Sequence, residues 1–202
     1  MTRSTVYLRE TILDKLIRAT LFDEVTDAHL TMWSATWQPA MAEHGARQTL
    51  HDKPEDRQWD WQAKAHHWRP LLSYHSFAIV CGGALQGLML ANDLKFARLP
   101  TPFAKFLVYM DYLATAPWNR PEVQQPPRYR GVGTVFMAAA IQLSLDLNYR
   151  GRLGLHALPA AEPFYRNCRM NALGRDTAYE NLMYFEMTAA QAKAFRQDRK
   201  TS

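Results

Sequence analysis

Apolar residues along the chain form short alternating runs and longer runs of helical spacing, which follow one another from end to end. Alternation predicts a first strand over residues 5–12, while residues 13–21 fit either its continuation or a helix. Two apolar runs, over 76–81 and 84–91, surround Gly82-Gly83 and predict a hairpin. Three further strands are predicted over residues 106–116, 151–157 and 179–187.

Helical segments separate these strands. One helix is predicted to begin at Thr26-Asp27, whose side chains suit a helix cap, and Pro39 would bend or restart it. A second helix is predicted over 55–72, because its apolar residues share one face. The other helices are predicted over residues 134–148, 160–168 and 189–199. Connections are predicted over residues 44–54, 92–102 and 117–127, with a turn at Leu173-Gly174. This order predicts a mixed sheet covered by helices, in the α/β (α+β) class.

The bulk composition fits a single domain over residues 1–202. Of the 202 residues 48% are hydrophobic, so the chain is long enough to bury a core, and no linker divides it. We expect residues 1–72 to supply the first strand and the substrate-side helices, 73–187 the rest of the sheet, and 188–202 the C-terminal helix and tail.

The same sequence indicates a cytoplasmic protein. It has no apolar run of about eighteen residues, as a membrane span requires, and its first residues lack the apolar core of a signal peptide. Cys81 and Cys168 lie in different predicted elements without metal-binding spacing, which is typical of reduced thiols. We therefore expect no membrane partner and no metal.

The charge balance admits two kinds of anionic partner. The net charge of +5 suits either a nucleic acid or an anionic cofactor. The basic residues are scattered, with no run of five, and the cluster near the C-terminus is typical of a solvated helix face. Charge alone therefore leaves both kinds of partner open.

A glycine-rich turn lies between the predicted strand over 106–116 and the predicted helix over 134–148. Its sequence is Arg128-Tyr129-Arg130-Gly131-Val132-Gly133. The first amides of a helix have no intrahelical partner, the helix dipole is positive there, and glycines let a phosphate approach the backbone. Two arginines add fixed positive charge, so the turn predicts a site for a phosphorylated ligand.

Two familiar phosphate motifs do not fit this turn. The dinucleotide fingerprint needs a third glycine where Phe136 stands, and the P-loop needs a Gly-Lys-Ser/Thr run, which does not follow. What remains is the pattern Arg-x-x-Gly-x-Gly, formed by Arg128, Gly131 and Gly133. This pattern resembles the pyrophosphate-binding loop of the GNAT superfamily of N-acetyltransferases.

A second motif strengthens the resemblance, which covers roughly residues 74–187. After the strand over 151–157, Ala161 and Tyr165 match the Ala-x-x-x-Tyr spacing of the superfamily. The chain departs from the usual letters at Leu158, where Asn is common, and at Arg169-Met170, where Gly-Phe is common. These departures do not change the predicted cofactor. They mean that details of the family's substrates are not carried over to this chain.

The resemblance implies a GNAT-like, mixed and mostly antiparallel sheet flanked by helices. It implies an N-acetyltransferase that moves an acetyl group from acetyl-CoA, as co-substrate, to a primary amine of a small molecule or protein. It places Tyr165 beside the CoA sulfur as general acid or hydrogen-bond donor. The cofactor-binding residues it implies are Tyr112, Leu113, Ala114 and Thr115 for pantetheine, and Arg128, Tyr129, Arg130, Gly131, Val132, Gly133 and Thr134 for pyrophosphate.

The general base stays open between two residues. Asp111 lies on the strand before the loop and would act if its side chain points into the cleft. His156 ends the following strand and has a suitable pKa range. Glu162 is a weaker candidate for the base, because a solvated carboxylate is typical of a helix start. Cys168 is predicted to be a small core residue and not a nucleophile.

The acceptor side is expected in the first seventy residues, which hold most of the tryptophans. The simplest interpretation is that these side chains pack helices onto the sheet, while one or two wall an acceptor pocket that favours cations or planar rings. Tyr74 and Trp118 would close its other side. The tryptophans concerned are Trp33, Trp37, Trp59, Trp61 and Trp68.

Two alternative functions remain open. One is a toxin-like acetyltransferase that acts on aminoacyl-tRNA, which the net positive charge permits. The other is a CoA-binding module without catalysis. The expected partners are acetyl-CoA and an amine acceptor; nucleic acid is less favoured without being excluded, and a homodimer stays open.

Overall fold

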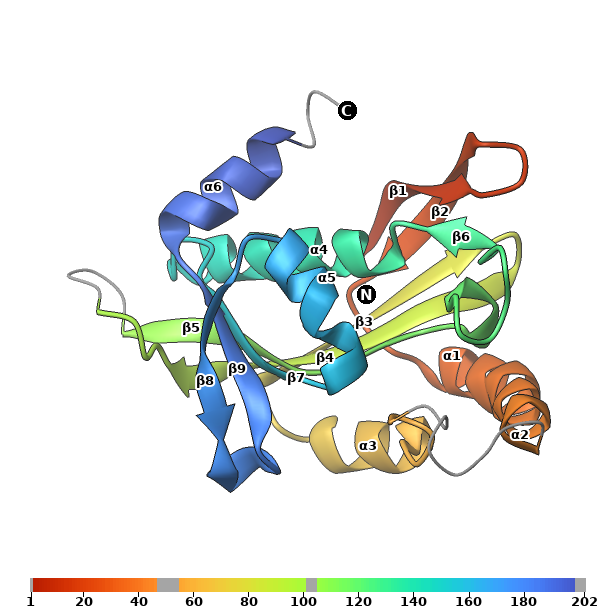
Figure 1. The fold of residues 1–202 in the computed structure, drawn as a ribbon, viewed down its shortest axis with the longest axis horizontal. Coiled ribbons are helices and arrows are strands. Elements are labelled where there is room, and N and C mark those ends of the chain that lie inside the picture. The colour runs from red at the N-terminus through yellow and green to blue at the C-terminus, as the bar shows by residue number, and fades with distance from the viewer. Residues whose placement is uncertain (1, 47–54, 101–104, 199–202) are drawn as a thin grey trace. The chain divides into compact units, whose positions relative to one another are not determined.

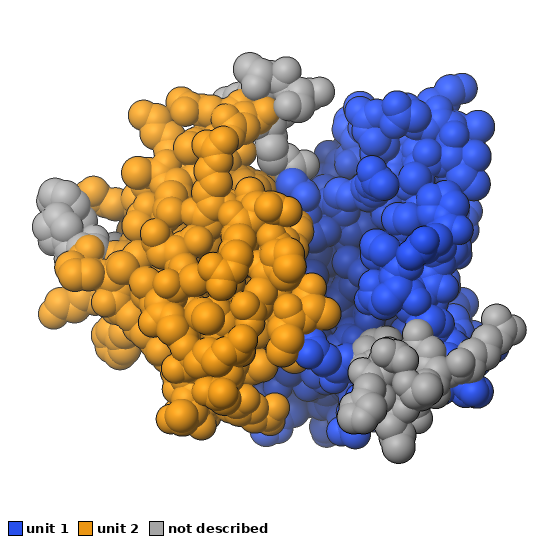
Figure 2. Space-filling model, viewed as in Figure 1, with its two compact units in different colours: residues 1–90, 112–136 blue, residues 91–111, 137–202 orange. Residues whose placement is uncertain are grey.

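A computed structural model describes residues 2–46, 55–100 and 105–198. It is a mixed α/β fold with a nine-stranded, mostly antiparallel sheet (Figure 1), which confirms the predicted fold class. The chain folds as two compact units (Figure 2). Unit 1 comprises Met1–Leu90 and Tyr112–Phe136, and unit 2 comprises Ala91–Asp111 and Met137–Ser202. That the chain forms one domain stays a prediction.

In unit 1 the strand order is β6-β1-β2-β3-β4, and β1 pairs antiparallel with both of its neighbours, as β2 does with β3. The predicted hairpin is confirmed, because Gly82 and Gly83 form its turn with φ of +58° and +73°, a conformation that favours glycine. Residues 13–21 are neither a continuation of the first strand nor a helix: after a turn over residues 11–14 they enter β2, a separate strand that pairs antiparallel with β1. The strands are β1 (Arg3–Glu10), β2 (Lys15–Phe22), β3 (Tyr74–Cys81), β4 (Ala84–Phe96, whose first residues belong to this unit) and β6 (Tyr129–Arg130).

The first helical segment of unit 1 contains a wide turn. Helix α1 (Asp27–Met32) begins after Thr26, as predicted, and leads through a π turn (Trp33–Trp37) into α2 (Gln38–Ala46). The Gln38 amide donates to the Trp33 carbonyl, an i to i−5 bond that inserts one extra residue in the turn. The predicted connection over 44–54 lies largely outside the described residues.

Helix α3 is shorter than predicted. It covers Trp61–Trp68 and not residues 55–72, because the Asp60 carboxylate accepts the amides of Gln62 and Ala63 and so fixes the helix start. The tryptophans of these helices pack on the sheet, as expected. The buried cluster includes Trp33, Trp37, Trp61, Leu85, Leu88 and Ala114.

In unit 2 the strand order is β4-β5-β7-β9-β8. Two predictions were wrong here. Residues 92–96 continue β4 and are not a connection, and the expected turn at Leu173-Gly174 lies inside a strand. The strands are β5 (Phe106–Thr115, up to Asp111 in this unit), β7 (Leu153–Ala157), β8 (Asn171–Asp176) and β9 (Leu182–Met187).

The helices of unit 2 agree closely with their predictions. They are α4 (Val132–Asp146, from Met137 in this unit), α5 (Glu162–Asn167) and α6 (Ala189–Asp198). No helix in the described ranges is both long and apolar enough to span a membrane.

A buried ion pair organises the sheet of unit 2. Glu186 on β9 is fully buried and pairs with Arg152, which is itself buried. The Glu186 carboxylate also accepts the backbone amides of Arg98 and Leu99 and the hydroxyl of Tyr184. One carboxylate therefore fixes β9 and the segment that follows β4.

Candidate functional site

The predicted anion loop lies in unit 1, at the start of α4. The first bond within the helix joins the Val135 amide to the Gly131 carbonyl over 2.9 Å, so α4 begins at Val132, two residues earlier than predicted. Helix geometry leaves the amides of Val132 and Gly133 without an acceptor inside the helix. Gly131 has a φ of +96°, which favours glycine at this position.

The loop fits a pyrophosphate group. A Cβ atom placed on Gly131 would meet nothing within 4 Å, so the backbone in front of the helix has open space beside it. Arg128 and Arg130 are exposed on either side of the buried Tyr129. Free amides, a positive helix end and two guanidinium groups form an arrangement that would hold two linked phosphates.

Backbone hydrogen bonds fix the approach to this loop. The Arg128 amide donates to the Trp118 carbonyl over 2.7 Å, and the Arg128 carbonyl accepts from Thr11 over 3.1 Å. The Tyr129 amide donates to the Asn119 side chain over 3.0 Å. The strand β6 pairs Arg130 with Arg9 of β1. The loop is therefore anchored from two directions.

Gln86 connects the loop to the β3–β4 hairpin. Its side chain is fully buried and accepts from the Trp118 indole and the Asn119 amide, both over 2.9 Å. Its own amide donates to the carbonyls of Cys81 and Ala84. Since Asn119 in turn holds Tyr129, Gln86 positions the loop through one intermediate side chain.

Gly87 lets α4 approach the sheet closely. A Cβ atom here would lie 2.5 Å from Phe136 and 2.7 Å from Val132, both buried residues of the first helical turns. Gly87 lies inside β4 and not in the phosphate loop itself. Its role is indirect, since it sets the distance between β4 and the start of α4.

The residues predicted to bind pantetheine form the end of β5 in unit 1. The Tyr112 ring lies edge-on to Trp59 at 5.0 Å, and Lys64 Nζ lies 3.4 Å from its centre. Ala114 is buried in the core. The Thr115 carbonyl already accepts from Arg120 Nε over 2.9 Å, so Tyr112, Leu113 and Ala114 are the better candidates for backbone pairing.

All three predicted catalytic residues lie in unit 2. Tyr165 is buried in α5, beside Phe185 and Cys168, and burial raises the pKa of its phenol above the ordinary value. Its hydroxyl therefore stays protonated across the physiological range.

His156 is held on both ring nitrogens. Its Nδ1 lies 2.5 Å from the Tyr109 hydroxyl, and its Nε2 lies 3.1 Å from Asp176 Oδ2. Arg98 pairs with the same Asp176 oxygen over 2.5 Å, and the Tyr179 ring stacks on the imidazole at 3.9 Å. These partners lie 20 to 58 positions from His156 along the chain, so no local sequence pattern predicts them.

The protonation of this network follows from its surroundings. Burial lowers the pKa of His156, more than the hydrogen bond with Asp176 raises it. The hydrogen bond from Arg98 is the main cause that lowers the pKa of Asp176, so this carboxylate is ionised and accepts from Nε2–H. Nδ1 must then accept from Tyr109, whose pKa burial raises. A proton can therefore reach His156 through the Tyr109 hydroxyl.

Asp111 lies two residues beyond Tyr109 on β5 and is half-buried. The parallel pairing of β5 with β7 covers only Val108 with Leu153 and Tyr109 with Gly154, although both strands continue. Asp111 and His156 both lie beyond the last of these pairs. The Asp111 charge also helps to raise the pKa of Tyr109.

Solved structures resemble this fold at low sequence identity. The GNAT domain of S. lividans PAT has a TM-score of 0.57 and 11% identity, covering 92% of this chain and 96% of that one. FeeM, an N-acyl amino acid synthase from uncultured soil microbes, has 0.56 and 10%, covering 88% and 94%. The paia N-acetyltransferase from Thermoplasma acidophilum, solved with coenzyme A, has 0.51 and 9%, covering 84% and 98%. No protein-family model matches this chain, and neither does any curated protein sequence. The chain therefore has the fold of the GNAT acetyltransferases.

Proposed function

We propose that the protein is an N-acetyltransferase that moves the acetyl group of acetyl-CoA to a primary amine. The observation that carries the proposal is the loop before α4, where Gly131 has open space beside it and Arg128 and Arg130 stand exposed. The GNAT fold and the solved relative that contains coenzyme A support the choice of CoA among phosphorylated ligands.

The proposal gives the two units different tasks. Residues of unit 1 hold the cofactor: the loop amides and arginines take the pyrophosphate, and backbone at Tyr112–Ala114 takes the pantetheine amides. Bound acetyl-CoA supplies an activated acetyl group as a thioester. One β5 amide that faces the thioester oxygen would stabilise the oxyanion by roughly 3 kcal/mol.

Residues of unit 2 move the protons. The amine nitrogen forms a bond to the carbonyl carbon, the carbon–sulfur bond breaks, and its electron pair stays on sulfur as a thiolate. Tyr165 would donate a hydrogen bond to that sulfur or pass its proton to it, and burial, which raises the pKa of its phenol, keeps the hydroxyl protonated and favours the hydrogen bond.

The proton that the amine loses has two proposed destinations. Asp111 is half-buried and would accept it directly or through water. Alternatively, the Tyr109 hydroxyl would take it while passing its own proton to His156 Nδ1, and Asp176 would stabilise the resulting imidazolium. The second route requires Tyr109 and His156 to act as a unit.

Calorimetry with acetyl-CoA, followed by thiol release with a panel of amines, tests the proposal. We expect micromolar binding and acetyl transfer to at least one amine. Tyr165→Phe should lower kcat by roughly 100-fold while the dissociation constant of acetyl-CoA stays within twofold. Normal turnover in Tyr165→Phe would remove the acid assignment. A protein that binds no acyl-CoA would overturn the function itself.

Double substitutions separate the two proton routes. If the relay operates, Tyr109→Phe and His156→Gln should each lower kcat by about 100-fold, and their combination should cost little more. If Asp111 is the base, Asp111→Asn should carry that loss and Tyr109→Phe should not.

A further inference from the structure

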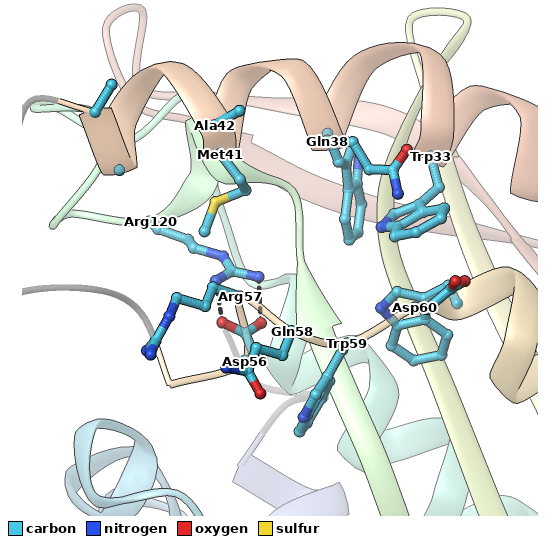
Figure 3. Close-up of a pocket in the computed structure, with 14 residues that line it drawn as sticks. Trp33, Gln38, Met41, Ala42, Asp56, Arg57, Gln58, Trp59, Asp60 and Arg120 are labelled. Atoms are coloured by element: carbon cyan, nitrogen blue, oxygen red, sulfur yellow. Dashed lines mark hydrogen bonds and ion pairs between the residues drawn. The ribbon is translucent and has the colours of Figure 1, made fainter.

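Unit 1 contains a pocket of about 610 Å³ that the proposed chemistry has not used (Figure 3). The π turn (Trp33–Trp37) and α2 form one wall, and the stretch before α3 forms the other, so two parts of the sequence face one another across it. Its size falls within the range of pockets for small molecules. Four of the six tryptophans of the chain line it: Trp33, Trp37, Trp59 and Trp61.

The two carboxylates that line this pocket are already engaged by the protein. Both oxygens of Asp56 accept from Arg120 over 2.7 Å, and both side chains are largely buried. The Asp60 carboxylate accepts two backbone amides at the start of α3. A cation entering the pocket would therefore meet carboxylates whose charge is already balanced or bonded. The aromatic surface is what distinguishes this pocket.

Buried packing holds the indole rings in place. Trp33, Trp37 and Trp61 belong to the core, with 5%, 3% and 2% of their surface exposed, and the Trp37 indole donates to the Leu85 carbonyl. These three rings are packed into the core and keep almost no surface for a ligand, so the half-buried Trp59 is the indole of this pocket that a ligand ring can contact. A planar aromatic ring gains from stacked or edge-on contacts with indole, whereas a saturated ring of the same size gains only from burial.

Two contacts join this pocket to the strand proposed to bind pantetheine. Trp59, which lines the pocket, lies edge-on to Tyr112 of β5. Arg120, which also lines it, donates to the Thr115 carbonyl at the end of the same strand. The aromatic pocket is thus built directly against the proposed cofactor strand, within one unit.

We propose that this pocket receives an aromatic ring of the acceptor, so that the substrate class is an alkyl amine that carries a planar aryl group. The assignment rests on the proposed function, because it takes the amine to be the acetyl acceptor. It adds a ligand chemistry that the fold alone leaves open.

A matched pair of amines tests the assignment in the full-length protein. 2-Phenylethylamine and 2-cyclohexylethylamine have the same chain and amine and differ in whether the ring is aromatic. We expect kcat/KM for the phenyl compound to exceed that for the cyclohexyl compound by about two- to tenfold. Equal values, or a preference for the saturated ring, would overturn the pocket assignment while the acetyltransferase function stands.

Two tryptophan variants locate the effect. Trp59→Leu should abolish the preference for the phenyl compound, while Trp59→Phe should restore part of it. Trp68→Leu is the control, because Trp68 packs on the same core cluster and stacks on Tyr74 outside the pocket. A preference that survives in Trp59→Leu, or that is lost equally in Trp68→Leu, would contradict the assignment.

Calorimetry without acetyl-CoA keeps the two proposals separate. If no amine is acetylated but 2-phenylethylamine binds, and Trp59→Leu abolishes that binding, the proposed function fails and the pocket is a binding site for an aryl amine that is not an acetyl acceptor. If acetyl-CoA is used on aliphatic amines and 2-phenylethylamine neither binds nor reacts, the function stands and the pocket assignment fails. A protein that binds neither acetyl-CoA nor 2-phenylethylamine would overturn both the proposed function and the pocket assignment.

Discussion

Unit 1 and unit 2 place their polar groups differently. The loop of unit 1 leaves the guanidinium groups of Arg128 and Arg130 exposed, and a neighbouring pocket presents indole surface. Unit 2 buries its functional polar groups, with His156 held by Tyr109 and Asp176, and Glu186 held by Arg152. An exposed group can exchange water for a ligand, whereas a buried group must be satisfied by the protein. The contrast favours binding in unit 1 and proton transfer in unit 2.

The largest effect is expected from the buried ion pair of unit 2. Glu186→Gln should lower the free energy of unfolding by about 3–5 kcal/mol, because it leaves the Arg152 charge buried without its counter-charge. Denaturant unfolding measures this. Glu162→Gln, which loses more exposed ion pairs with Arg166 and Arg175, should cost about 1 kcal/mol or less. If both variants lose the same stability, the burial of Glu186 is not what matters.

The next effect should fall on binding in unit 1. The double reversal Arg128→Glu with Arg130→Glu should weaken acetyl-CoA binding by about 100-fold or more, since two charge-assisted contacts become repulsive. Calorimetry checks this against Lys193→Glu with Arg196→Glu, an equal charge change on exposed positions of α6 in unit 2. Comparable weakening in that control would mean that net charge, rather than the loop, attracts the cofactor.

Two glycines allow a similar comparison at a smaller scale. Gly87→Ala and Gly154→Ala should each destabilise by about 1–3 kcal/mol, because a Cβ would lie 2.5 Å from Phe136 in one case and 2.7 Å from the Tyr184 hydroxyl in the other. Only Gly87→Ala should also weaken acetyl-CoA binding, since it displaces the start of α4. Loss of cofactor binding in Gly154→Ala would break the division of tasks between the units.

The smallest effect concerns pH and involves one histidine in each unit. Burial is the main cause that lowers the pKa of both His29 and His156, so the folded state prefers them neutral. The unfolded chain then binds protons first, and the free energy of unfolding should decrease as pH falls below about 6.5. The slope should not exceed about 1.4 kcal/mol per pH unit for each histidine.

Unfolding curves between pH 5 and 8 test this linkage. His29→Gln and His156→Gln should each flatten the pH dependence, by similar amounts. A wild-type stability that rises on acidification in this window would show that other groups dominate.

The sequence predicted the features that depend on neighbouring residues. Local backbone geometry alone determines three of them, so a short stretch of sequence is enough to predict each: the Gly82-Gly83 turn, the helix start after Thr26 and the Arg128–Gly133 turn. A turn was wrongly predicted inside strand β8, because Leu173-Gly174 has a sequence typical of turns. The pairing of β8 with β9 depends on a second segment and cannot be predicted from residues 171–176 alone. The network around His156 joins residues up to 78 positions apart, which no local pattern specifies.

The wide turn at Trp33–Trp37 makes the acceptor pocket sensitive to chain length. Deleting one residue there would replace the i to i−5 bond by ordinary α-helical bonding and rotate α1 by about 100° relative to α2. Trp33 would swing off the wall while Trp37 stayed. Relatives that differ by a one-residue gap in this helix should therefore accept different amines with unchanged cofactor loops, so that an insertion or deletion, rather than a substitution, would mark a change of substrate.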